Sequence, residues 1–516
     1  MNNYVVLSYS FISYFAMFLC GLIFRFVLSA IKNNKNNVGK VFYRKIMNFS
    51  KVERKCLFLY LYRMSLKIPF YKEKLEKALQ DKNFSFVLKG SLSTAITLFF
   101  VQGLRFVSGV LIGRLYGAEA SGRLTLIVTV MGIFAILINF GVKDALQKLI
   151  PEYNQKYNTK TSYSLFLKGN QIILVFSFVS GIIIYFISPW LCNYWNEPNM
   201  LWLFRISGFF LPFMVLGELN YFSLRAALKV HTANMSLVLP TIIRVVVLLI
   251  VTKYFFNIYN PIYLHWTTLC VLPWLFSLVP IYNYFIKPSR TEPTLKTVSY
   301  NEIFTMAFPM LMTYIAFLIN NSADVFLLKS NNIGTDMVGI YKTCANISML
   351  AATLLVALNT TVQPKITQLF TQNKLDEVQR ITNNSSKLIF WLSLPVFIVL
   401  LFFSNQVMWL YGEEFRKGAI CLSVLTIGQI INTICGPVAQ LLNATGHHKQ
   451  FRNISFVGAI VNIVANLILI PKYGILGSAI ANTFSMIAWN IIGTIYIKKT
   501  FGFFIGYFPF IKKIST

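Results

Sequence analysis

The sequence is poor in charged residues, which make up only 12% of it, whereas apolar residues make up 56% and the mean hydropathy is +0.61. This balance excludes a soluble globular domain and indicates a polytopic membrane protein. The seven cysteines are scattered singly, without a C-x-x-C pair or a metal-ligand spacing, so we interpret them as packing residues. The sequence also has no nucleophile and base pair, metal cluster or nucleotide motif. We therefore expect neither an enzyme nor a bound cofactor.

Long apolar runs dominate the rest of the chain. A transmembrane helix needs about 20 mostly apolar residues, which predicts one early span near 4–31 and twelve more. The twelve are 90–112, 124–142, 168–189, 199–222, 235–252, 262–286, 303–328, 337–362, 387–404, 418–443, 453–470 and 475–497. We expect an all-α membrane protein of two six-helix bundles, 90–286 and 303–497, joined by a cytoplasmic linker at 287–302. An extra N-terminal transmembrane helix in 1–31 precedes them.

The net charge of +30 does not indicate nucleic acid, because Lys and Arg alternate from loop to loop. Loops assigned to the inside hold 20 of these residues and loops on the other side hold 7, as the positive-inside rule requires. This predicts that residues 82–89 and the basic tail, 498–516, are cytoplasmic. The extra span then places Met1 outside.

Residues 32–89 form a basic segment with 15 Lys or Arg against 4 Asp or Glu, and aromatic residues are interleaved at 57–62. The pattern favours a cytoplasmic segment that lies on anionic lipid headgroups. A further hypothesis is that this segment recruits a glycosyltransferase. A solvated linker is the alternative. The preceding apolar run is too long for a signal peptide, so we expect it to be kept as an anchor, unless the true start is Met47 or Met64.

An internal duplication is visible in the motif G-x-[DE]-x-x-G, which occurs at 117–122 and again at 334–339. His231 and His448 are separated by the same interval as the two motifs. Because each half holds an even number of spans, the halves should be related by an axis along the membrane normal and should enclose a transporter-like cavity. Taken alone, each motif is also explained by a tight loop that needs glycine for its backbone angles.

Three arginines, Arg105, Arg205 and Arg244, lie inside apolar runs of the first bundle, where an unpaired cation costs several kcal/mol, on the order of 2.5–3.5 on insertion scales. The rise of a helix, about 1.5 Å per residue, places all three in one belt at and just above the midplane. We expect them to face a watery cavity or a bound anion. Arg205 is also near enough to the outer interface to extend its charge into water.

Four further polar residues in or directly beside the spans are candidates for function. Glu218 and Asp324 are candidates for ion coupling or for pairing with an arginine, although Glu218 is near the inner end of its helix and Asp324 near the outer rim. Gln363 and Gln429 are candidates for hydrogen bonds to sugar hydroxyls. The alternative for both glutamines is a hydrogen bond between helices, which polar residues often make in lipid.

Several motifs in order carry a family resemblance. They are the Thr445-Gly446 turn with basic residues after it, Asn462 and Asn466, the Ile470-Pro471-Lys472-Tyr473-Gly474 hairpin, the small residues 477–481, and in the first half Gly113-Arg114-Leu115-Tyr116-Gly117 and Asn139-Phe140-Gly141. This pattern, over roughly 86–500, resembles the polysaccharide flippase family (Wzx-type O-antigen flippases) of the multidrug/oligosaccharidyl-lipid/polysaccharide exporter superfamily.

The resemblance implies a multi-pass flippase of the bacterial inner membrane that moves undecaprenyl-pyrophosphate-linked oligosaccharide by rocker-switch alternating access. Its partners would be this polyprenyl-pyrophosphate-linked glycan, membrane lipids and other polysaccharide-assembly proteins, and no nucleic acid. Pyrophosphate suits the arginines, because guanidinium binds phosphate oxygens through two donors and stays charged when desolvated.

Three alternatives stay open. A drug or metabolite exporter of the same superfamily typically places a carboxylate in the first core span, where this chain has Arg105. A polysaccharide polymerase or ligase carries a large outer loop, whereas the longest one predicted here is roughly 405–417. A scaffold or channel is disfavoured by the duplicated six-span plan.

Overall fold

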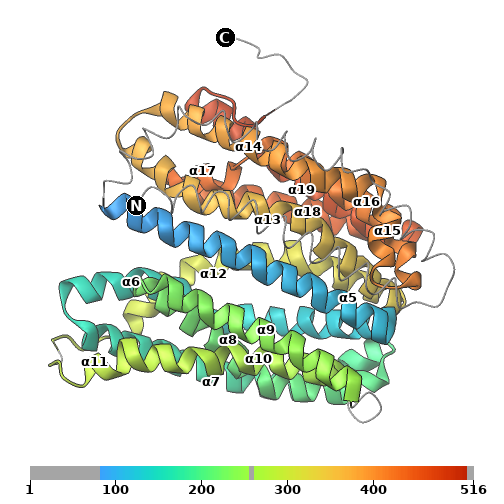
Figure 1. Ribbon diagram of the computed structural model, residues 1–516, viewed down its shortest axis with the longest axis horizontal. Helices are drawn as coiled ribbons and strands as arrows, with labels where there is room; N and C mark the ends of the chain where they lie inside the picture. The colour runs from blue at the N-terminus through green and yellow to red at the C-terminus, as the bar shows by residue number, and fades with distance from the viewer. Residues whose placement is uncertain (1–81, 255–260, 294, 508–516) are drawn as a thin grey trace, which may run out of the picture. The chain divides into compact units, whose positions relative to one another are not determined.

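The computed structural model describes residues 82–254, 261–293 and 295–507, and most of the chain in these ranges is helical (Figure 1). Within them, nine helices are long and apolar enough to cross a membrane. The predicted class, an all-α polytopic membrane protein, is therefore confirmed. The expected extra helix in 1–31 and residues 32–81 of the basic segment lie outside the described ranges.

The N-terminal half is the chain from α5 to α11, and the C-terminal half is the chain from α12 to α19. The first half contains α5 (Lys82–Asn139), α6 (Val142–Lys156), α7 (Thr159–Tyr194), η1 (Pro198–Met200), α8 (Leu201–Ala226), α9 (Val230–Tyr254), α10 (Pro261–Ile281), η2 (Tyr282–Ile286) and α11 (Lys287–Ser289). The second half contains α12 (Tyr300–Ser330), α13 (Thr335–Thr371), α14 (Leu375–Phe402), α15 (Ser404–Trp409), η3 (Glu413–Gly418), α16 (Ala419–Cys435), α17 (Val438–Ala444), α18 (His448–Tyr473) and α19 (Ile475–Phe501). The predicted core spans fall on these helices, and their division into twelve plus one stays a prediction.

The helices pack mainly within their own half. In the first half α8 packs against α7 and α10, and α9 packs against α10. In the second half α19 packs against α18 and α16, and α14 packs against α13. Figure 1 shows α6 to α10 grouped apart from α13 to α19. Helix α12 joins the two sets, because it packs against α18 and also against α6.

The first copy of the repeated motif differs from the expected loop. Helix α5 runs through it with a single kink at Gly117, where φ is 82° and ψ is −179°. That positive φ is the reason for glycine at this position. Residues 118–122 are helical, so the loop predicted for them is wrong. Gly334, the counterpart of Gly117, has an ordinary φ of −54° and precedes α13.

A second difference is α6, which occupies the first part of the region predicted as an inner loop, 143–168. Val142, Leu146 and Tyr153 are buried on one side of it, which is the pattern of an amphipathic helix. The helix begins after Gly141, whose φ is 80°. A search for apolar runs of membrane length does not detect a short amphipathic helix of this kind.

A third difference lies in the predicted span 418–443, which is broken between α16 and α17. Gly436 there has a φ of 76°, and Pro437 has no N–H to continue the helical hydrogen bonds. The carbonyl of Ile434 accepts a hydrogen bond of 2.8 Å from the backbone N–H of Tyr507. The segment after α19 therefore satisfies a carbonyl that the break leaves free.

Candidate anion site and polar clusters

Arg244 is a buried cation in the middle of α9. The residue is 6% exposed, and its Nε has no hydrogen-bond partner. Within the described residues, no hydrogen bond or ion pair to a carboxylate is found for this guanidinium. A buried, unpaired cation is costly, so this arginine is the strongest candidate for contact with an anionic ligand.

Arg105 and His265 lie within electrostatic reach of Arg244, one on α5 and the other on α10. The Nη1 of Arg105 donates a hydrogen bond of 3.3 Å to the Oε1 of Gln102 in its own helix. The Nδ1 of His265 is buried without a partner. Three helices thus contribute two guanidinium groups and one imidazole, with Arg244 within electrostatic reach of the other two groups.

Sequence reasoning missed His265. A signal was available, because it is a single histidine within the apolar run 262–286. Its relation to Arg244 depends on how α9 and α10 pack against each other, which the sequence pattern does not reveal.

Arg205 lies in a different environment from the other two arginines. Its guanidinium carbon is 4.3 Å from the ring centroid of Tyr185 on α7 and 5.6 Å from that of Trp202 on its own helix, α8. Both rings are largely exposed. The structure therefore brings Arg105 and Arg244 together and gives Arg205 cation–π contacts. The expectation of a single belt of three arginines stays a prediction.

Glu218 is paired inside the N-terminal half. Its Oε1 accepts a hydrogen bond of 2.6 Å from the Nζ of Lys143, and its Oε2 accepts one of 3.2 Å from the Nδ2 of Asn139. The lysine also lies over the ring of Phe222, 5.1 Å from its centroid. This carboxylate already has a cation, so among the described contacts its clearest role is to join α8 to the junction of α5 and α6.

Asp324 is the buried carboxylate of the C-terminal half, in a residue that is 4% exposed. Its oxygens accept hydrogen bonds from the Tyr341 hydroxyl at 2.5 Å, from the Nδ2 of Asn482 at 2.8 Å and from the Nδ2 of Asn466 at 3.3 Å. Lys342 is within electrostatic reach. The donors come from α13, α18 and α19, so the carboxylate stands where four helices meet.

The two glutamines differ in their surroundings. Gln429 is buried on α16, and its Oε1 accepts a hydrogen bond of 3.4 Å from Asn432, whose own oxygen accepts one of 3.1 Å from Asn490 on α19. This chain of amides links α16 to α19. Gln363 on α13 is half-buried, and its backbone carbonyl accepts a hydrogen bond from Thr367. Sugar binding by either glutamine stays a prediction.

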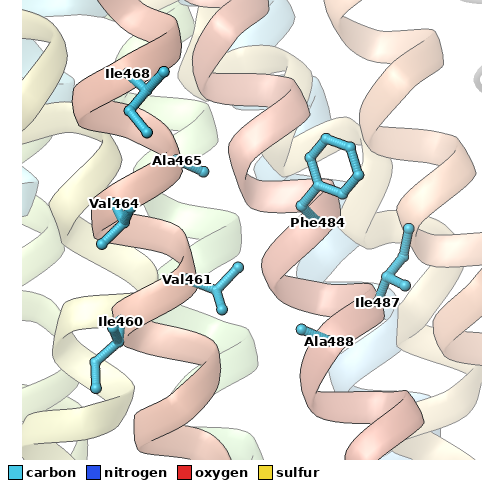
Figure 2. A pocket seen from close by; sticks show the side chains of 8 residues that line it. All are labelled: Ile460, Val461, Val464, Ala465, Ile468, Phe484, Ile487 and Ala488. Carbon is cyan, nitrogen blue, oxygen red and sulfur yellow. The ribbon is translucent and has the colours of Figure 1, made fainter.

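An apolar groove lies between α18 and α19 (Figure 2). Its lining is Ile460, Val461, Val464, Ala465, Ile468, Phe484, Ile487 and Ala488. These side chains offer no hydrogen bond, so the groove suits hydrocarbon and not a charged or sugar group.

The described residues contain no group of three or more His, Cys, Asp or Glu placed to hold a metal ion. The five cysteines in these ranges are buried and form no disulfide.

The fold is similar to that of a solved membrane transporter. A solved inward-facing conformation of a multidrug resistance MATE family transporter of the MOP superfamily matches it with a TM-score of 0.67 and 14% identity, over 79% of this chain and 98% of that one. The family model described as polysaccharide biosynthesis protein matches residues 87–370, more than half of the chain. The chain belongs to this family, which confirms the resemblance. The MatE model also matches residues 309–468.

Curated relatives of the chain include proteins that are named flippases. The probable low-salt glycan biosynthesis flippase of Haloferax volcanii is 27% identical over 179 residues, which are 34% of this chain and 36% of that protein. The lipid II flippase of Bacillus subtilis is 23% identical over 409 residues, 72% of this chain and 75% of that protein. The chain thus matches about a third of the length of the Haloferax relative and three quarters of the Bacillus one.

Proposed function

We propose that this protein is a flippase that moves an undecaprenyl-pyrophosphate-linked oligosaccharide, such as an O-antigen or capsule repeat unit, across the bacterial inner membrane by alternating access. The observation that carries the proposal is the buried guanidinium of Arg244, which has no described partner. The names of relatives add support, since one is named a probable glycan biosynthesis flippase and another a lipid II flippase.

The ligand class follows from the charge of the site. Arg244 and Arg105 are like charges within electrostatic reach of each other, and a bound anion relieves both the repulsion and the desolvation of Arg244. Pyrophosphate carries enough oxygens to accept two bonds from each guanidinium. In the proposal His265 donates a further hydrogen bond. A neutral drug or an organic cation would leave these charges uncompensated.

The other predicted residues receive separate roles in the proposal. Arg205 belongs to the outer part of the path, where it meets the headgroup after Arg244. The glycan contacts Gln363 and Gln429. Asp324 couples transport to a cation, because its carboxylate is held by neutral phenol and amide donors. Glu218 is held by Lys143 and keeps a structural role.

A second candidate is export of a small metabolite, and the match of residues 309–468 to the MatE model favours it. The substrate of such an exporter would be an anion as well, because the arginine site is the same. A transport measurement with a lipid-linked glycan and with a soluble anion distinguishes the two candidate functions.

The experiment is complementation in a strain that lacks its own flippase. Arg244→Ala should leave the protein inserted but stop surface polysaccharide assembly, and Arg244→Lys should restore it only in part, because a lysine keeps the charge without the two-pronged geometry. Arg225→Ala is the matched control, since Arg225 lies at the end of α8 and donates to Tyr221 in the same helix. Normal polymer at normal levels of the Arg244→Ala protein would contradict the anion site.

A further inference from the structure

The two copies of the G-x-[DE]-x-x-G motif touch each other. A Cβ on Gly122 would overlap the backbone oxygen of Thr335, and a Cβ on Gly339 would lie 2.5 Å from the backbone oxygen of Ala118. Gly122 and Gly339 occupy equivalent positions of the repeat, and so do Ala118 and Thr335. Each glycine of one half therefore packs on the partner position of the other half, as a two-fold relation between the repeats requires.

These contacts join backbone to backbone. No side chain fits at either glycine, because a Cβ would overlap the facing carbonyl. The second glycine of each motif thus serves a close approach of the two halves rather than a turn. The contact lies where α5 bends and where α12 turns into α13. We call this the outer end of the helices, since the loop charges predict that it faces outside.

Two glutamates at equivalent positions also make contacts from each half to the motif of the other half. Glu197, between α7 and η1, accepts a hydrogen bond from the Thr335 hydroxyl in the other half. Glu414, in η3, accepts a hydrogen bond of 3.3 Å from the backbone N–H of Ala118 in the first half. The two glutamates are separated by the same interval as the two motifs. Each half therefore holds the motif of the other half with a carboxylate at an equivalent position.

The contact made by Glu197 carries more charge. The Nζ of Lys329 lies 3.1 Å from its Oε1, in an ion pair whose side chains are 7% and 14% exposed, and the Nε of Arg123 lies 3.9 Å from its Oε2. The residue equivalent to Lys329 in the first half is Ile112, so that half does not repeat the ion pair.

The contact made by Glu414 is reinforced by Arg114 instead. Its Nε and Nη2 donate hydrogen bonds to the carbonyls of Leu410 and Trp409, at 2.8 Å and 3.0 Å. The two carboxylate contacts are thus equivalent in position but differ in what supports them.

We propose that these paired contacts form an outer gate, in which Glu197 and Glu414 each hold the repeated motif of the opposite half and must release it for the outer end to open. That the gate serves transport rests on the proposed function, whereas the release itself does not. The gate is closed in this structure, because both carboxylates are bound and both glycines are packed. The repeated motif is then a gate element common to the two halves.

The test is hydrogen–deuterium exchange on the full-length protein in nanodiscs, without substrate. Losing one charge-assisted contact should raise the ratio of open to closed gate by about tenfold. Glu197→Gln and Glu414→Gln should each increase exchange in the peptides around 114–123 and 333–341 by about that factor, and the double variant should increase it further. Exchange at the opposite ends of the helices, around 226–234 and 370–378, should not rise.

Glu119→Gln is the matched control. It removes one negative charge within the first copy of the motif, but Glu119 pairs with Arg123 in its own helix and is largely exposed. Equal exchange in Glu119→Gln and Glu197→Gln would overturn the gate, and so would a rise along the whole chain, which indicates general loss of stability. If Glu197→Gln does not fold, Glu414→Gln still decides, since it leaves no buried lysine unpaired. Exchange without substrate tests the gate, whereas substrate transport by the Arg244 variants tests the proposed flippase, so failure of the gate is distinguishable from failure of the proposed function.

Discussion

Replacing Arg244 with methionine should stabilise the fold and weaken ligand binding. The unpaired guanidinium costs the folded protein about 2.5–3.5 kcal/mol when placed in the centre of a membrane helix. Replacing buried charged groups by apolar residues of similar volume is often neutral or stabilising by about 1–4 kcal/mol. We therefore expect Arg244→Met to raise the free energy of unfolding by about 1–3 kcal/mol.

The same change should weaken binding of the anion. A hydrogen bond to a charged group contributes about 1.5–3 kcal/mol, so loss of one such contact raises Kd by about tenfold to a hundredfold. Opposite signs for stability and binding distinguish a ligand site from a structural one. If Arg244 were a structural residue, the protein would lose stability when it was replaced.

The assay measures thermal unfolding of the purified protein by tryptophan fluorescence, with and without a polyprenyl pyrophosphate. Wild type should be stabilised by the ligand and Arg244→Met should not. Lys143→Met is the comparison, because it leaves Glu218 without its cation. If Arg244→Met unfolds as early as Lys143→Met and still responds to the ligand, the reasoning is refuted.

Three further outcomes follow from the structure. Lys143→Met should lower the free energy of unfolding by about 1–2 kcal/mol, less than for a fully buried pair, because Glu218 keeps some contact with water; a melt unchanged from wild type would contradict it. Asp324→Asn should keep polyprenyl pyrophosphate binding but remove the dependence of transport on the cation gradient, which proteoliposomes with and without a gradient can measure. At the linker, burial opposes ionisation of Glu302, but hydrogen bonds from Tyr153 and Lys296 outweigh it and lower its pKa below the ordinary 4.5. The ionised carboxylate therefore stabilises the fold at neutral pH, and this stabilisation should be lost as pH falls below about 4.5. Glu302→Gln should remove that part of the acid dependence of thermal unfolding.

The helices and the buried arginine were predictable because each leaves a signal in the chain. A lipid environment requires long apolar runs, and a charge inside such a run is conspicuous, as Arg244 is. The rotation of each helix leaves no comparable signal. It decides that Arg205 stacks on Tyr185 while Arg105 approaches Arg244. Sequence spacing alone placed all three at similar depth and did not separate them.

For the repeat too, sequence spacing predicts which positions are equivalent, whereas the contacts between them depend on how the helices pack. The constant interval between the two halves identified equivalent positions, but the spacing does not show that the two copies of the motif touch each other. Contact between Gly122 and Thr335 depends on how the halves meet, and the pairing of Glu218 with Lys143 depends on how α6 folds back. Short amphipathic helices such as α6 carry too few apolar residues to be noticed among membrane-length runs.

The central claim is tested most directly by transport in proteoliposomes loaded with a fluorescent undecaprenyl-pyrophosphate-linked oligosaccharide. An impermeant quencher or glycosidase reports how much of the glycan has crossed. Wild-type protein should move the glycan, Arg225→Ala should match it, and Arg244→Met should reduce the rate to that of empty vesicles. Transport by Arg244→Met at the wild-type rate, or a wild-type protein that leaves the glycan on its original side, would contradict the account.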